Sequence, residues 1–111
     1  MEKGPQILSI YAAILAASRQ MLDLAKEQNW DALVDLELER RQIVAKLRST
    51  LEQSPAPLNG AEHSESEVLI RNILAIDEQT RNLAQSWMAE LDQQLSSLGT
   101  SKRLRNTYLN P

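Results

Sequence analysis

The sequence predicts an all-α protein: an antiparallel helical bundle of three main helices plus a short C-terminal fourth helix, in one domain over residues 1–111. Two observations predict this class. Leu, Ala and Gln, which favour helices, are abundant, whereas glycine and proline occur only at Gly4-Pro5, within 55–60, at Gly99 and at Pro111. Between these places the apolar residues recur at steps of three and four, which is typical of helices with one buried face.

The first two helices are expected over residues 6–28 and 30–53. Pro5 suits the start of a helix, and Ile7, Tyr11 and Ile14 begin an apolar stripe on the first one. Asn29 can cap the second helix, and Asp31 then lies in its first turn, where the helix dipole favours an acid. We therefore expect a helical hairpin with its turn just before Trp30.

The apolar stripe of the second helix is interrupted by Glu37, Arg40 and Arg41. Glu37 and Arg41 are four residues apart with the acid first, which favours an ion pair. The pattern allows two interpretations: a surface ion pair beside the core, or a polar notch that lines a groove for another protein. The sequence does not separate them.

A loop is expected over 54–63, followed by a third helix over 64–98. Ser64 and Glu67 have the spacing of a capping box, and Gly99 is placed to end the helix as a left-handed cap. His63, at the end of the loop, is expected to be exposed to solvent, because no other catalytic or ligating residues accompany it.

The third helix is longer than the hairpin, so its last apolar residues, Trp87, Leu91, Leu95 and Leu98, need a cover. A second copy, a partner protein or the C-terminal segment could supply it. That segment is expected to form a helix over 101–108, with Leu104 and Tyr108 on one face, too short to be stable alone. It carries three basic residues and no acid, whereas residues 1–98 have a net charge of −6.

Composition excludes several function classes. Cysteine is absent and there is one histidine, so no usual zinc site or cysteine nucleophile is available, and we expect no catalytic residue, cofactor or metal. Asp77 and Arg81 are interpreted as an exposed ion pair rather than acid–base machinery. The acidic body argues against direct nucleic-acid binding. No apolar run approaches the ~18 residues of a membrane span and no secretion signal is recognised, so a cytoplasmic location is expected.

Three segments resemble the FliT family of flagellar type III export chaperones. Ser18–Ala25, followed by Asn29–Val34 and Glu37, is similar to the family's first hairpin with its tryptophan-aspartate turn. Ile70–Gln79 resembles its third helix, and Leu104–Tyr108 resembles its fourth, which ends in an asparagine-tyrosine element. The resemblance covers nearly the whole chain except the loop.

The resemblance implies a cytoplasmic chaperone that binds the filament-cap protein FliD and delivers it to the export apparatus, through the ATPase FliI and the export gate FlhA. It implies that the fourth helix folds back and hinders partner binding until it is displaced. In enteric bacteria such proteins also restrain the transcription activator FlhDC, which the resemblance leaves open for this chain.

Two sets of partner-binding residues follow from this reading. The expected cargo face is the apolar stripe of the third helix, comprising Ile73, Ile76, Leu83, Trp87 and Leu91. The expected contact with the export gate is Leu104, Asn106 and Tyr108. The alternative is a generic helical adaptor or a homodimeric scaffold, in which the same stripe forms a permanent dimer core. The sequence leaves open the oligomeric state and whether the fourth helix docks on its own chain or on a neighbour.

Overall fold

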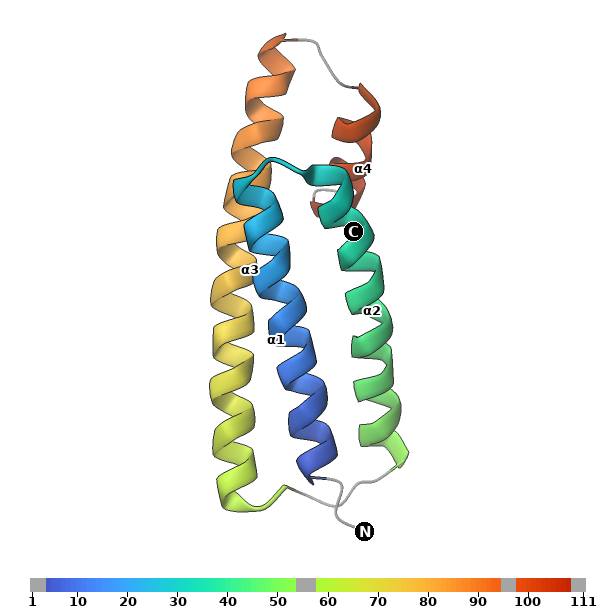
Figure 1. Cartoon of the computed structure of the whole chain (residues 1–111), viewed down its shortest axis with the longest axis vertical. Coiled ribbons are helices and arrows are strands. Elements are labelled where there is room, and N and C mark those ends of the chain that lie inside the picture. The colour runs from blue at the N-terminus through green and yellow to red at the C-terminus, as the bar shows by residue number, and fades with distance from the viewer. Residues whose placement is uncertain (1–3, 54–57, 95–97, 109–111) are drawn as a thin grey trace.

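The computed structural model describes residues 4–53, 58–94 and 98–108, and within them four α-helices. These are α1 (Gly4–Lys26), α2 (Trp30–Gln53), α3 (Gly60–Gln94) and α4 (Leu98–Tyr108). They form an elongated bundle with extents of 55 × 22 × 19 Å (Figure 1). The predicted class, three long helices and a short fourth, is confirmed.

Helix α1 joins the bundle together, because it packs against both α2 and α3 (Figure 1). Within the described residues, no Cα atom of α2 comes within 8 Å of one in α3. At the end where α1 stops and α2 begins, α4 also packs on both α2 and α3 (Figure 1). Helices α2 and α3 are thus joined by α1, which contributes to both clusters, and at the upper end by α4 as well.

The turn between α1 and α2 is a tight helix-ending motif. The amide of Asn29 donates to the carbonyl of Leu24 at 2.9 Å, and that of Gln28 donates to Ala25 at 3.1 Å. This is the bonding of a Schellman motif, whose left-handed position is usually a glycine. Here Gln28 occupies it, with φ of 60°. The predicted end of the first helix at residue 28 is therefore two residues too late, whereas the predicted bounds of α2 are confirmed.

Helix α3 begins earlier than predicted. The Asn59 side chain accepts from the amide of Glu62 at 2.8 Å, and the Glu62 carboxylate accepts from the amide of Asn59 at 3.1 Å. This reciprocal capping box replaces the one predicted at Ser64, which was wrong because an equivalent pair precedes it. The expected loop therefore ends at Asn59, and its residues 54–57 lie outside the described part. His63 is exposed as predicted, but in the helix, 3.1 Å from Glu67.

The predicted end of the third helix at residue 98 is also wrong, because Leu98 and Gly99 lie inside α4, and residues 95–97 lie outside the described part. No described glycine has a positive φ, so the predicted left-handed cap is wrong. Glycine disfavours a helical conformation by only about 1 kcal/mol, so its presence does not by itself end a helix. The side chains of Leu95 and Leu98 lie outside the described part.

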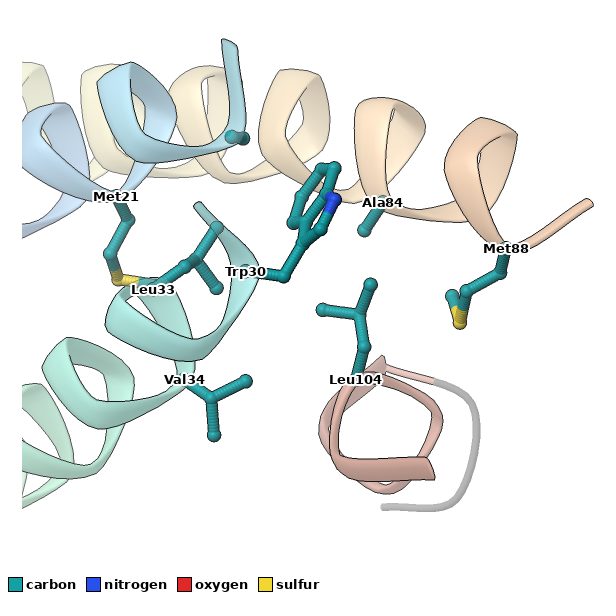
Figure 2. Packing of buried hydrophobic residues seen from close by; sticks show 8 residues of the cluster. Met21, Trp30, Leu33, Val34, Ala84, Met88 and Leu104 are labelled. Atoms are coloured by element: carbon teal, nitrogen blue, oxygen red, sulfur yellow. The ribbon is translucent and has the colours of Figure 1, made fainter. Parts of the chain in front are cut away.

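The buried side chains form two clusters along the bundle. The lower cluster, near the N-terminus, is built from α1, α2 and α3 and comprises Ile7, Ile10, Ile14, Leu15, Leu47 and Ile73. The upper cluster draws on all four helices and comprises Met21, Ala25, Trp30, Leu33, Val34, Ala84, Met88 and Leu104 (Figure 2).

Helix α1 is long and apolar enough to cross a membrane by length and composition, contrary to the expectation from sequence. In the bundle, however, 44% of its most apolar 18-residue window is buried inside the protein. Its buried residues include Ile7, Ile10 and Ile14, which make much of the lower cluster. The apolar character of α1 is thus that of a central core helix, a common cause of this signal.

Candidate partner-binding surface

Helix α4 is held by one leucine that is completely buried. Leu104 has 0% exposure and points into the upper cluster, toward Trp30 and Ala84 (Figure 2). Of the three covers considered for the third helix, the C-terminal segment of the same chain is the one present, and it covers part of α3. It hides Ala84 and Met88 of α3.

A basic residue next to Leu104 fastens the outer edge of α4 to α2. Arg103 donates to Asp31 at 2.9 Å and to Asp35 at 2.6 Å, and the Thr100 hydroxyl lies 3.1 Å from Asp31. The hydrogen bond to Asp35 is the main reason why the pKa of Arg103 is raised above its ordinary value. We call Arg103, Asp31 and Asp35 the latch. All three side chains are partly exposed to water, so the latch is weak.

Tyr108 ends α4 and packs against the upper cluster. Its hydroxyl is buried and makes no hydrogen bond within the described part of the chain. Burial raises the pKa of Tyr108 to about 12, because ionisation would place a negative charge in an apolar surrounding. Since Thr100 meets Asp31 while Tyr108 lies near Arg40, α4 runs in the same direction as α2 (Figure 1).

A polar belt separates the two clusters. Arg40 of α2 donates to the hydroxyl of Ser18 at 2.8 Å and pairs with Asp77 of α3 at 2.7 Å. Ser18 is completely buried and donates in turn to the carbonyl of Ile14 at 2.8 Å. The predicted pair between Asp77 and Arg81 is therefore wrong, because Asp77 bonds across to α2 and helps to fix the distance between the long helices.

Below this belt, α2 and α3 border an open groove of about 450 Å³. Its apolar lining includes Ile14, Val44 and Ile73, and its polar lining includes Glu37, Arg40, Arg41, Arg48 and Asp77. Arg41 donates to Glu37 at 2.9 Å, so the predicted pair is confirmed. The first interpretation, a surface ion pair, is thus confirmed; the pair also lines a groove, and binding of another protein in that groove stays a prediction.

The predicted cargo face is largely used inside the protein. Ile73 lies in the lower cluster, Leu91 is buried, and Ile76 and Trp87 are half-buried against the two clusters. The ring centroids of Trp87 and Trp30 are 5.3 Å apart. Only Leu83 of this set, at 38%, is exposed. The set is therefore not one continuous surface while α4 is docked.

The three residues expected to contact the export gate differ in exposure. Asn106 is exposed, Tyr108 is half-buried and Leu104 is fully buried. In the docked state only Asn106 and part of Tyr108 are available to a partner.

Two parts of the surface were not identified residue by residue from the sequence. The latch joins Arg103 to acids about seventy positions earlier, and the groove includes Val44 and Arg48 of α2. The opposite charges of the C-terminal segment and the rest of the chain indicated an attraction of the kind seen in the latch. The polar interruption in the apolar stripe of α2 indicated the groove. Within the described residues, no group of three or more His, Asp or Glu is arranged to hold a metal ion.

Comparison with known proteins decides the family. The family model described as "Flagellar protein FliT" matches residues 8–110. The chain belongs to the FliT family of flagellar proteins. It is 31% identical over 112 aligned positions to a flagellar protein FliT of Yersinia pseudotuberculosis, covering 97% of this chain and 88% of that protein. It is 28% identical over 108 positions to one of Photorhabdus laumondii, covering 97% and 85%.

A third FliT relative, from Yersinia enterocolitica, is 60% identical over a segment of 38 residues, which is 34% of this chain. No solved structure matches the chain. The resemblance seen in the sequence is thus confirmed at the level of the family, and the segments that carry it lie mainly in the four described helices.

Proposed function

We propose that this member of the FliT family is a cytoplasmic flagellar type III export chaperone. It binds the filament-cap protein FliD, delivers it to FliI and FlhA, and acts without catalysis or a cofactor. The observation that carries the proposal is that α4 is a short, weakly fastened cover over apolar residues of α2 and α3. Restraint of FlhDC belongs to the proposal on the family resemblance alone.

The cover is removable on physical grounds. Helix α4 has 11 residues, fewer than the ~12–15 that an isolated helix needs for marginal stability in water. It is held by one fully buried leucine, the half-buried ring of Tyr108 and an exposed ion-pair group, far fewer buried residues than α1 has, so it exchanges between docked and free states more easily than α1 does. When it leaves, Val34, Ala84 and Met88 lose part of their cover.

An apolar strip between two helices suits an amphipathic helix of another protein. A partner of this kind needs neither a metal nor a titrating residue. Cargo binding therefore uses the surface that α4 covers, together with neighbouring exposed residues such as Leu83.

The test is calorimetric titration of a C-terminal fragment of FliD from the same organism. It is titrated into the full chain, into Leu104→Ala, and into a shortened chain ending at Gln94. We expect binding in each case, about tenfold or more tighter once α4 is undocked or removed. The matched control is Lys102→Ala, which removes a basic side chain from an exposed position of α4 and should bind like the unaltered chain. Absence of binding by all forms would overturn the proposal.

Docking to the export gate is tested separately with Asn106→Ala. Asn106 is exposed, so its loss leaves the docking of α4 unchanged. We expect weaker binding to FlhA with unchanged binding to FliD. Equal loss of both would contradict the assignment of separate surfaces.

A permanent homodimer is the main alternative. It rests on an uncovered apolar stripe of the third helix, and in the structure Trp87 of that stripe packs against the upper cluster, in which Leu104 of α4 lies with Ala84 and Met88 of α3. Sedimentation of the full chain at micromolar concentration distinguishes the two, with a monomer expected for a chaperone of this design and a stable dimer for the alternative.

A further inference from the structure

The two carboxylates of the latch form a site of definite chemistry. Asp31 and Asp35 are four residues apart on α2, so they lie on one face of the helix, and Arg103 bonds to both. Like charges at this spacing repel one another, and a cation placed against both relieves the repulsion. Their side chains are 54% and 66% exposed with Arg103 present, so they remain accessible to a ligand when α4 leaves.

Beside the acidic pair is the space that Leu104 fills. Leu104 follows Arg103 directly, and it is buried among residues that include Val34, Ala84 and Met88 (Figure 2). One turn later, Tyr108 packs against the same cluster. The seated helix thus shows what this surface accepts: a cation, a leucine directly after it, and an aromatic ring one turn further on.

We propose that the surface beneath α4 selects partner helices that reproduce this pattern. The partner carries Lys or Arg immediately before a leucine-sized residue, and an aromatic residue four positions after that. This inference rests on the proposed function, because it specifies the class of helix that displaces α4. The acids that hold the cover closed therefore also recognise the helix that opens it.

The reason lies in what a competitor must replace. A helix that fills the apolar space without a cation leaves the repulsion between Asp31 and Asp35 without a counter-charge. It therefore lacks the attraction that Arg103 of α4 makes with both carboxylates, and it binds more weakly than a basic helix. A helix with an acid at that position adds a third negative charge. Only a basic helix competes with α4 on equal terms.

The experiment removes either the basic or the acidic side chains of the latch in the full chain. One variant is Arg103→Gln and the other is Asp31→Asn with Asp35→Asn, both combined with Leu104→Ala so that α4 is loosened equally. The Arg103→Gln variant leaves both carboxylates for a ligand, and the double aspartate variant leaves none. The probe is a capped synthetic peptide that reproduces residues 98–108, and binding is followed by the fluorescence of Trp30 and Trp87, which lie in or beside the upper cluster.

We expect the peptide to bind the Arg103→Gln variant about fivefold more tightly than the double aspartate variant at low salt, with the difference shrinking as salt is added. A peptide with Glu in place of the residue equivalent to Arg103 should show the reverse order. Circular dichroism checks that both variants are equally folded. Equal affinity of the original peptide for the two variants would overturn the charge selectivity.

The same two variants, titrated with the FliD fragment, separate this inference from the proposed function. Tighter binding to the Arg103→Gln variant supports both. Equal binding to the two overturns the inference and leaves the chaperone function standing. No binding to any form overturns the proposed function, and the peptide experiment then still decides the chemistry of the surface.

Discussion

The upper and lower ends of this bundle differ in which helices connect α2 to α3. At both ends α2 and α3 are too far apart to pack directly, so a third helix must lie between them. At the lower end that helix is α1, which has 23 residues and is directly connected to α2 by a short turn. At the upper end α1 is joined by α4, which has 11 residues and follows a segment outside the described part. The lower end is therefore filled by α1 alone, whereas the upper end also contains a short helix that leaves under the proposed function.

The two ends also differ in what they leave exposed. The upper cluster includes residues from all four helices, whereas Val44 and Leu51 of α2, toward the lower end, are 36% and 43% exposed. The belt formed by Ser18, Arg40 and Asp77 lies between them. Exposed apolar residues of α2 thus lie toward the lower end, whereas apolar residues at the upper end are covered by α4.

The largest expected effect tests whether the upper cluster is a true core. Trp30 is buried beside Trp87, so Trp30→Ala should lower the free energy of unfolding by about 3–5 kcal/mol. Val44→Ala, in the open groove of the same helix, should cost less than about 1 kcal/mol. Urea denaturation measures both. A loss below about 0.5 kcal/mol for Trp30→Ala would mean that the upper end is a binding face rather than a core.

The second prediction concerns the cover alone. Leu104→Ala should weaken the docking of α4 by about 2–3 kcal/mol, because it empties a fully buried position. Amide hydrogen exchange should then show loss of protection in Leu98–Tyr108, with protection in α1 retained. If α1 lost its protection as well, α4 would be an integral part of the fold, and the contrast between the two ends would disappear.

Much of this comparison could be predicted from the sequence, since long apolar stripes are local and periodic. The bounds of α2, the surplus apolar length of α3 and the shared face of Leu104 and Tyr108 follow from spacing alone. The predicted ends of the third helix were wrong. A capping box at Asn59 and Glu62 precedes the one expected at Ser64, and Gly99 lies inside α4 instead of ending the third helix.

The site was less predictable than the fold. The pairs Arg40–Asp77 and Arg103–Asp35 join residues 37 and 68 positions apart, so no local pattern reports them. The expected cargo residues were chosen from apolarity, which does not distinguish a stripe that binds a partner from one that α1 or α4 already covers. Exposure had to come from the structure.

The third prediction uses pH to loosen the upper end only. The pKa of Tyr108 is raised from 10.0 to about 12 when α4 is docked, so the docked state keeps its proton where the free state loses it. Docking is therefore unaffected below pH 10 and weakens as the pH rises from 10 toward 12. Arg40, Arg81, Glu37 and Asp77 are the charged groups that act on this hydroxyl, and burial outweighs them.

Tyr108→Phe is the matched control, because it removes the titrating group and a buried hydroxyl without a partner in the described residues. Its α4 should dock about 1 kcal/mol more tightly at neutral pH. Hydrogen exchange of α4 measures docking at neutral pH. At alkaline pH, docking is followed by a fluorescent label attached to a cysteine introduced as Asn106→Cys, because this signal does not depend on the ionisation of tyrosine. The same alkaline loosening in Tyr108→Phe would show that another group causes it.

The smallest expected effect concerns the turn between α1 and α2, at the upper end of the bundle. Gln28 holds a left-handed conformation with φ of 60°, which costs a residue with a side chain about 1 kcal/mol or more, whereas glycine adopts it freely. After the extra chain entropy that glycine loses on folding, Gln28→Gly should stabilise the protein by about 0.5 kcal/mol. Asn29→Gly, one residue later, has no strain to relieve and should not stabilise it. Because the turn fixes where α1 ends and α2 begins, the gain should appear in thermal unfolding of the whole bundle and leave the docking of α4 unchanged. An equal gain in α4 protection would mean that the turn also sets the position of Asp31, and that the turn and the docking of α4 are coupled through it.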